Sequence, residues 1–208
     1  IEPVTRIEGH AKVTIRMKED GTVDHAYMHV NEFRGFEKFC EGRMVFEMPL
    51  ITPRICGICP VSHHLASAKA GDDAFGAPPP RPASLLRELM HMGQVVQSHG
   101  MHFFELAGPD LILGFDADPA VRNAIGLLQA NPELTVRAVN LRKWGQEIIA
   151  ILGGRRIHPS FAVPGGVNKA LSKEDREKIL SGYDEAIKTI QTGIAIYTDW
   201  VEKNLEVI

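Results

Sequence analysis

Cysteine is scarce in this chain. Cys40, Cys56 and Cys59 are the only three among 208 residues. An odd number of cysteines, two of them three positions apart, makes a poor framework for disulfides. The pattern is more typical of a reducing compartment, where such a pair binds a metal or acts as a redox dithiol. We therefore expect a cytoplasmic protein.

Long apolar runs and clusters of one charge are also lacking. No stretch approaches the roughly 20 apolar residues that a membrane span requires. The formal net charge is −3, and the 44% of hydrophobic and 24% of charged residues are ordinary for a globular protein. We therefore expect no membrane span, and the composition indicates no nucleic-acid partner.

Alternation of apolar and polar residues predicts two strands near the N-terminus. Residues 11–17 and 23–30 alternate, and Asp20-Gly21 between them is a strong turn signal. Together they predict a β-hairpin over residues 11–30. Helical spacing follows over residues 33–44, and the prolines at 49 and 53 bracket a segment that we expect to be extended.

The rest of the chain has the pattern of helices. Ser84 and Asp118 stand where N-cap residues are expected, and Ser172 opens a capping box before a long apolar stripe that reaches Leu205. Helices are predicted over residues 61–74, 85–106, 135–152 and from 173 onward. The predicted fold is mainly α with a small N-terminal antiparallel β-sheet, an α+β class in which residues 61–208 are helical.

The segment Arg54-Ile55-Cys56-Gly57-Ile58-Cys59-Pro60-Val61-Ser62-His63-His64 carries the clearest chemistry. Two thiols at this spacing can bind one soft metal ion, such as zinc, nickel or iron. A closed zinc site needs four protein ligands, and the chain has no second cysteine pair. A thioredoxin-like dithiol normally follows a buried strand, which the two preceding prolines disfavour.

This segment resembles the N-terminal signature of nickel–iron hydrogenase large subunits, Arg-x-Cys-Gly-x-Cys-x-x-x-His. Four more elements resemble the same family, in the expected order along the chain. They are Thr5-Arg6-Ile7-Glu8-Gly9-His10, Phe33-Arg34-Gly35-Phe36-Glu37, Gln97-Ser98-His99-Gly100-Met101-His102-Phe103-Phe104 and Gly153-Gly154-Arg155-Arg156-Ile157-His158-Pro159.

The sequences of two segments, residues 32–43 and 59–69, most resemble those of the cytoplasmic, cofactor-coupled branch of the family. Within that branch they are most similar to the NAD-reducing, bidirectional enzymes. In the family, a second Cys-x-x-Cys lies near the C-terminus of a much longer chain. Because no cysteine follows Cys59 here, we expect this chain to be the N-terminal half, with the C-terminal half absent. Its long last helix would then present part of its apolar stripe to that half.

The resemblance implies a role for each matching residue. Cys56 is expected to be a terminal nickel ligand, and Cys59 to bridge nickel and an iron that carries diatomic ligands, since thiolates suit these soft metals. Glu8 is expected to relay protons as a buried carboxylate near the metals, whereas a lone glutamate is more often a surface residue. His99 and His102 lie on one predicted helix, and we expect them to form hydrogen bonds between helices rather than a proton relay.

Three further residues are assigned through the same resemblance. Glu37 is expected to bind a magnesium or calcium ion, since a carboxylate suits a hard cation; the alternative is an exposed ion pair with a neighbouring Arg or Lys. Arg54 and His63 are expected to donate hydrogen bonds near the bridge and to a cysteine sulfur. We expect Cys40 to be a buried small hydrophobe and His64 to be replaceable by alanine at little cost.

The implied activity is the reversible oxidation of dihydrogen to protons and electrons. Electrons are expected to leave through a small subunit with iron–sulfur clusters, and to reach NAD through a flavin-bearing diaphorase module. A deazaflavin or heterodisulfide-type partner is the alternative acceptor. A non-catalytic zinc or thiol-redox module is a further alternative, as is a nickel-free respiratory complex I-like subunit, against which Cys56 and Cys59 argue.

Overall fold

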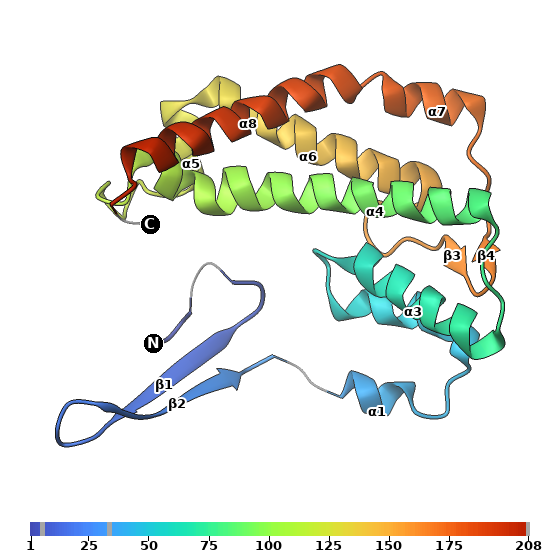
Figure 1. The fold of residues 1–208 in the computed structure, drawn as a ribbon, viewed down its shortest axis with the longest axis horizontal. Helices are drawn as coiled ribbons and strands as arrows, with labels where there is room; N and C mark the ends of the chain where they lie inside the picture. The colour runs from blue at the N-terminus through green and yellow to red at the C-terminus, as the bar shows by residue number, and fades with distance from the viewer. Residues whose placement is uncertain (5–6, 33–34, 207–208) are drawn as a thin grey trace. The chain divides into compact units, whose positions relative to one another are not determined.

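The structure is a computed structural model that describes residues 1–4, 7–32 and 35–206. The chain forms two compact units, Ile1–Glu41 and Gly42–Ile208. Helices dominate the second unit and a hairpin dominates the first (Figure 1). The predicted class, mainly α with a small antiparallel sheet, is confirmed.

The first unit contains the predicted hairpin. Strand β1 (Ala11–Met17) pairs antiparallel with β2 (Val23–Val30), in a register that sets Ala11 opposite Val30. Lys18 N–H donates to Thr22 O over 2.8 Å to close the turn. Gly21 in this turn has a φ of 82°, a left-handed conformation that glycine adopts without a steric penalty.

Helix α1 (Phe36–Cys40) is shorter than the predicted helix over residues 33–44. Glu41 leaves the helical conformation at ψ 130°, and Gly42 then adopts a φ of 76°. Phe33 and Arg34, at the start of the predicted helix, lie outside the described residues. Cys40 is half-buried, which is less buried than the small hydrophobe that the sequence predicted.

The segment expected to be extended between the two prolines is helical, which contradicts the prediction. It is covered by helix α2 (Met48–Ile51) and the 3₁₀ turn η2 (Thr52–Ile55), and the 3₁₀ turn η1 (Val45–Glu47) precedes it. Pro49 and Pro53 each lie in the first turn of their element. Proline fits there because a first-turn N–H has no helical acceptor.

The second unit is built from long helices and short connecting elements. In chain order these are α3 (Pro60–Phe75), α4 (Arg81–Met101), the π-helical turns η3 (His102–Ala107) and η4 (Pro109–Leu113), α5 (Ala124–Ala130), α6 (Pro132–Gly153), the two-residue strands β3 (Ala162–Val163) and β4 (Gly166–Val167), α7 (Lys173–Leu180) and α8 (Tyr183–Lys203).

The helix ends correct two of the predicted caps and confirm one. Helix α4 begins at Arg81, so Ser84 lies inside it. Asn123 caps α5 in place of Asp118, since its Oδ1 accepts hydrogen bonds from two backbone N–H groups at 3.0 and 3.1 Å. Ser172 does cap α7, because its Oγ accepts from Asp175 N–H at 3.0 Å.

The long C-terminal helix is broken in two, which the sequence did not predict. Helix α7 ends at Leu180 and α8 begins at Tyr183. The Trp144 ring lies against the break, where a Cβ on Gly182 would be only 2.4 Å from it. The indole N–H also donates to the carbonyl of Ile179 over 3.0 Å, so it binds the last turn of α7.

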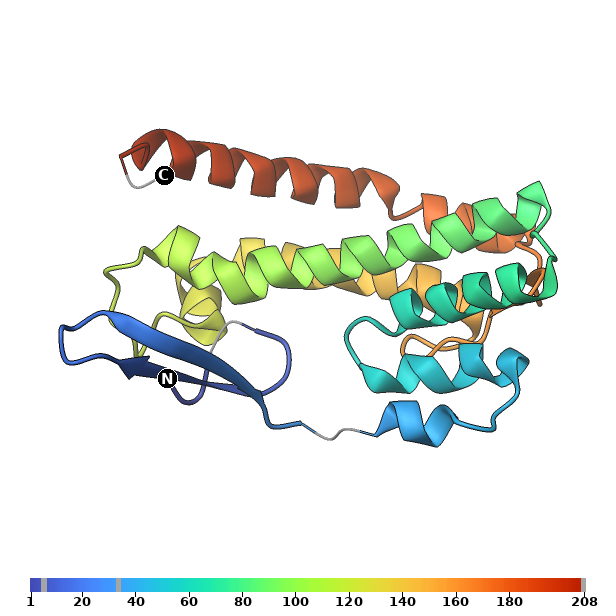
Figure 2. The same ribbon diagram turned by 60° about the horizontal axis from the view of Figure 1, so that its bottom comes forward.

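Helices α4 and α6 form the centre of the second unit, with α3 and α8 on opposite sides of this pair (Figures 1 and 2). Glycines allow the close contact, since a Cβ on Gly145 of α6 would lie 2.7 Å from the carbonyl oxygen of Gly93 on α4. The core between α3, α4 and α6 contains fully buried residues, among them Val61, Met90 and Ile149.

Helix α8 keeps much of its apolar surface exposed. Ile194 and Tyr197 are 61% and 50% exposed, and they line a groove of about 460 Å³ between α4, η3 and α8. That this stripe packs against a C-terminal half stays a prediction. Within the described ranges, no helix is both long and apolar enough to cross a membrane.

Candidate metal centre

The cysteine pair lies in the turn that joins η2 to α3. Cys59 is the N-cap residue of α3, and Pro60 begins its first turn. Both thiols are half-buried. The N-terminus of a helix favours a negative charge, so it would stabilise a metal-bound sulfur at Cys59.

The sulfur of Cys56 accepts hydrogen bonds from the backbone of the turn. The N–H groups of Ile58 and Cys59 lie 3.3 and 3.4 Å from Cys56 Sγ. Gly57 precedes both donors, and a Cβ on it would meet no atom within 4 Å. Two N–H donors directed at one sulfur suit a metal-bound cysteine, whose sulfur carries negative charge.

The structure brings His63 to the cysteine pair but gives Arg54 a different contact. His63 Nε2 lies 3.5 Å from Cys59 Sγ, within hydrogen-bonding distance of the expected bridging sulfur. The exposed Arg54 side chain donates to the carbonyl of Leu50, one turn back along the chain.

His64 is fully buried at 0% exposure. Its Nδ1–H donates to Pro49 O at 2.6 Å, and its Nε2 accepts from Phe161 N–H at 3.1 Å and from Ala162 N–H at 2.8 Å. These partners require the neutral ring with the proton on Nδ1. Burial lowers the pKa of His64 in agreement with this, as does the charge of Arg87, whereas the bond to Pro49 acts in the opposite direction.

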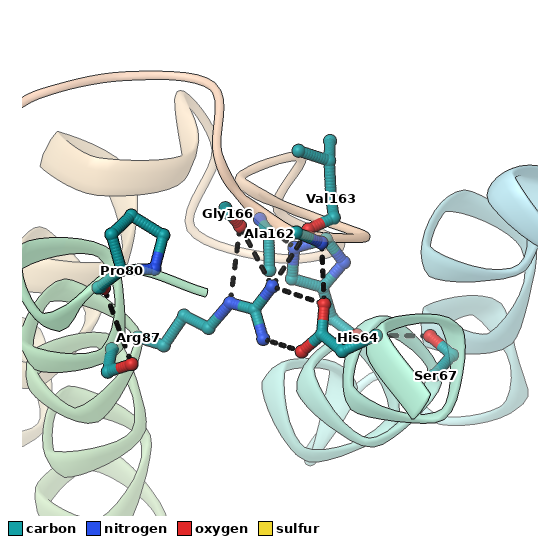
Figure 3. A network of polar contacts seen from close by, with 10 residues as sticks. His64, Ser67, Pro80, Arg87, Ala162, Val163 and Gly166 are labelled. Carbon is teal, nitrogen blue, oxygen red and sulfur yellow. Dashed lines mark hydrogen bonds and ion pairs between the residues drawn. The ribbon is translucent and has the colours of Figure 1, made fainter. Parts of the chain in front are cut away.

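A buried ion pair holds the β3–β4 hairpin against α3 and α4 (Figure 3). Arg87 binds both carboxylate oxygens of Asp72, at 2.6 and 3.1 Å, and also donates to the carbonyls of Val163 and Gly166. Burial alone would raise the pKa of Asp72, but hydrogen bonds from Arg87 and Gly165 and the charge of Arg87 lower it.

Two further side chains fix the backbone around the cysteines. Gln94 of α4 donates to Ile58 O at 2.9 Å, and the Nδ1–H of His158 donates to Pro53 O at 2.9 Å. His158 belongs to one of the motifs that resemble the hydrogenase family, although its contact was not foreseen. No sequence signal singles out Gln94, because its role depends on how α3 and α4 pack.

Glu8 and Glu37 lie in the first unit, whereas Cys56 and Cys59 lie in the second. Glu8 lies in the bend before β1 and Glu37 on α1, both with exposed side chains. Thr5 and Arg6 of the opening motif lie outside the described residues. Over the ranges that the structure describes, no three His, Cys, Asp or Glu side chains gather as a metal site would require.

The histidine at the end of α4 contacts its own helix. His99 Nδ1–H donates to Val95 O at 3.0 Å, one turn earlier in the same helix. The sequence predicted a hydrogen bond between helices for His99, and the geometry contradicts it. His102 begins η3 and is exposed.

Comparison with known proteins identifies the family. Residues 34–132 match the family described as nickel-dependent hydrogenase, and residues 1–33 match one described as HoxL-like. The chain is 46% identical over 208 residues to the vhu F420-non-reducing hydrogenase of Methanocaldococcus jannaschii, covering 100% of this chain and 50% of that one. The chain belongs to the nickel-dependent hydrogenase large-subunit family.

Two more members of the hydrogenase family extend this likeness. The NAD-reducing hydrogenase HoxS subunit beta of Cupriavidus necator is 45% identical over 98% of this chain and 44% of its own length. The crystal structure of an NAD⁺-reducing [NiFe]-hydrogenase in the H₂-reduced state superposes with a TM-score of 0.92 at 47% identity, over 100% of this chain and 46% of that one. The chain therefore spans about half the length of the hydrogenases it matches.

The residues present fit half of the nickel–iron centre that this hydrogenase family implies. Thiolates are the soft donors that nickel and iron favour. Cys59 stands at the N-terminus of α3, and two backbone N–H donors are aimed at Cys56. His63 lies beside Cys59, where a second-sphere donor would tune a metal-bound sulfur. Two thiols do not complete the four-ligand set of a structural zinc site.

Proposed function

We propose that the full-length protein oxidises dihydrogen reversibly to two protons and two electrons at a nickel–iron centre. The observation that carries this proposal is the Cys56–Cys59 turn, with its hydrogen-bonded sulfurs, in a chain of the hydrogenase family. Heterolytic cleavage of dihydrogen is the chemistry that the bound metal pair would supply. The residues of this chain would bind it, tune it and move protons.

Cys56 would be a terminal nickel ligand and Cys59 would bridge nickel and iron. A thiolate has several lone pairs, so one sulfur can serve two metals. His63 would donate a hydrogen bond to the bridging sulfur, since its Nε2 is 3.5 Å away. Arg54, two residues before Cys56, would donate to groups bound near the metals, which requires its side chain to leave its bond with Leu50.

Glu8 would accept the proton released by cleavage and pass it toward solvent. A carboxylate beside a metal site can do this once burial has raised its pKa. This role requires the bend before β1 to be covered in the assembled protein, because the Glu8 side chain is exposed in the first unit.

Glu37 would bind a magnesium or calcium ion, to which its hard carboxylate oxygens are suited. Lys38, a candidate for the alternative ion pair with Glu37, forms an ion pair with Glu41 at 2.5 Å.

Electrons would leave through a small subunit that carries iron–sulfur clusters and would reduce NAD⁺ through a flavin-bearing diaphorase module. The superposition with an NAD⁺-reducing enzyme supports this acceptor. The similar identity to an F420-non-reducing hydrogenase, whose name gives no NAD coupling, supports an acceptor other than NAD⁺ as the alternative. A deazaflavin or a heterodisulfide-type partner would then take the electrons. We place the assembly in the cytoplasm, because a metal-binding thiol pair is typical of a reducing compartment.

Activity of the purified complex tests this proposal. The full-length protein, together with its diaphorase module and small subunit, should convert H₂ and NAD⁺ to NADH and H⁺. Cys56→Ser should abolish the reaction, and the matched control Cys40→Ala should retain it. Reduction of an artificial dye without reduction of NAD⁺ would support the alternative acceptor. If the wild-type complex contained nickel but oxidised no dihydrogen, the proposal itself would be contradicted.

A further inference from the structure

Gln94 is a buried amide next to the cysteine turn. It lies on α4, is only 3% exposed, and its Nε2 donates to Ile58 O over 2.9 Å. Ile58 lies between the two cysteines. Gln94 is thus a side chain from another helix that contacts the backbone of the turn itself.

The carbonyl that Gln94 contacts belongs to the same peptide unit as the N–H of Cys59. That N–H is directed at Cys56 Sγ, 3.4 Å away. A continuous chain of hydrogen bonds therefore runs from the Gln94 amide through one peptide group to the sulfur. The planarity of the peptide makes the orientation of its carbonyl and the orientation of its N–H a single variable.

We propose that Gln94 is a positioning residue for the metal centre. It fixes the Ile58–Cys59 peptide so that the Cys59 N–H points at Cys56 Sγ, and it strengthens that N–H···S bond by polarising the peptide. The inference rests on the proposed function, because it assigns Cys56 to nickel. Hydrogen bonds in a chain polarise one another, and hydrogen bonds to a metal-bound sulfur tune the metal.

The direction of the effect follows from simple electrostatics. A hydrogen bond to a thiolate withdraws electron density from the sulfur, which then donates less to nickel. The more oxidised state of the metal is stabilised less, so the reduction potential rises. Loss of the Gln94 bond therefore lowers the potential of the nickel centre.

Gln94→Met and Gln97→Met form a matched pair of variants in the full-length protein bound to its small subunit. Methionine has a similar length and a slightly larger volume than glutamine but has no N–H donor. Gln97 is the same residue type on the same helix and is also buried, at 4% exposure. Both variants remove one buried amide, but only the first removes the contact with Ile58.

Two measurements read the result. Redox titration followed by the nickel EPR signal gives the midpoint potential of the loaded centre. Hydrogen exchange of the peptide that spans residues 55–61 reports the backbone order of the turn and needs no metal. Gln94→Met should lower the potential and speed exchange relative to wild type, whereas Gln97→Met should change neither.

Gln94→Glu supplies a rescue within one protein. A protonated carboxyl can donate to Ile58 O, whereas an ionised one cannot. The midpoint potential of Gln94→Glu should therefore approach the wild-type value at acidic pH. At alkaline pH it should fall below the wild-type potential measured at the same pH, so that it changes more with pH than the wild-type potential does. Hydrogen exchange over residues 55–61, compared with wild type at the same pH, should be near the wild-type rate at acidic pH and faster at alkaline pH, and it tests the backbone contact if the methionine variant does not fold.

The outcomes separate this inference from the proposed function. Unchanged potential and exchange in Gln94→Met, in a wild-type-like nickel-loaded complex, overturn the role of Gln94 and leave the hydrogenase proposal standing. Equal shifts in both methionine variants also overturn it, because the cause would then be helix packing. If the wild-type complex contains no nickel, the proposed function fails, and unchanged hydrogen exchange in Gln94→Met would still refute the backbone contact.

Discussion

His64→Ala is expected to destabilise the protein severely, although the sequence suggested a small effect. The ring is fully buried and pairs with three backbone groups from two distant segments, Pro49 O on one side and Phe161 N–H and Ala162 N–H on the other. Alanine removes all three bonds at once. The expectation of little cost was wrong, because adjacent histidines on a helix point in different directions and only burial tells them apart.

The size of the effect can be worked out from these contacts. Leaving a buried polar group unpaired costs about 1–3 kcal/mol, so three such groups with a ring-sized cavity give at least about 5 kcal/mol. That is comparable to the whole stability of a small domain. The neighbouring His63 is half-buried, so His63→Ala should cost less than about 1 kcal/mol and serves as the matched control.

The pH dependence gives a second signature of the same residue. The pKa of His64 is lowered from its ordinary value of 6.5, mainly by burial. The unfolded chain therefore takes up a proton below about pH 6.5 that the folded state refuses, so stability falls as pH drops from 6.5 toward the folded pKa. His64→Asn, which cannot titrate, should lack this loss.

Urea unfolding of the full-length protein at pH 7.5 and 5.5 measures both effects. The reasoning would be refuted if His64→Ala and His63→Ala unfolded at the same urea concentration. It would also be refuted if wild type and His64→Asn lost equal stability between the two pH values.

Three further predictions follow from the ion pair and the proposed site. In a double-mutant cycle, Asp72→Leu and Arg87→Met should each lower the free energy of unfolding by about 4 kcal/mol, because each leaves a buried charge unpaired. The double variant should lose only about 5 kcal/mol, since only backbone groups then stay unpaired. Strictly additive losses in denaturant unfolding would contradict a coupled pair. Glu8→Gln should keep the metals but strongly slow the exchange of dihydrogen with deuterated solvent, since an amide cannot take up the proton. An unchanged exchange rate would remove Glu8 from the proton path. Cys59→Ser should prevent assembly of the metal pair, whereas Cys56→Ser should lose nickel and could retain iron, as metal analysis of the two variants would reveal.

The sequence predicted those parts of the fold whose signal is local. The β1–β2 hairpin matched its predicted bounds because period-two alternation and an Asp-Gly turn act over a few residues. Helix α3 and the Ser172 cap matched for the same reason. Local chemistry sufficed at these places.

The errors came from features that depend on tertiary contacts or on ambiguous residues. Pro49 and Pro53 were interpreted as breakers, yet each fits the first turn of a helix. The break between α7 and α8 depends on Trp144, which approaches from α6. The β3–β4 hairpin has only two residues in each strand, and side chains of α3 and α4 bind its backbone, namely His64, Asp72 and Arg87.

In the candidate site, too, local motifs were predictable from the sequence and tertiary contacts were not. Cys56, Cys59 and His63 were found from spacing and resemblance, and the structure brings them together. Their supports, Gln94 and His64, were missed as such, because each acts through a backbone group far away in sequence. The roles of Glu8 and Glu37 stay predictions.

The metal content of the full-length protein, purified with its small subunit, is the sharpest test of the nickel–iron assignment. If Cys56 and Cys59 belong to a nickel–iron centre, elemental analysis of the complex should find nickel in stoichiometric amounts, together with iron beyond what the clusters of the small subunit require. Zinc as the metal of the large subunit, with nickel absent, would contradict that assignment.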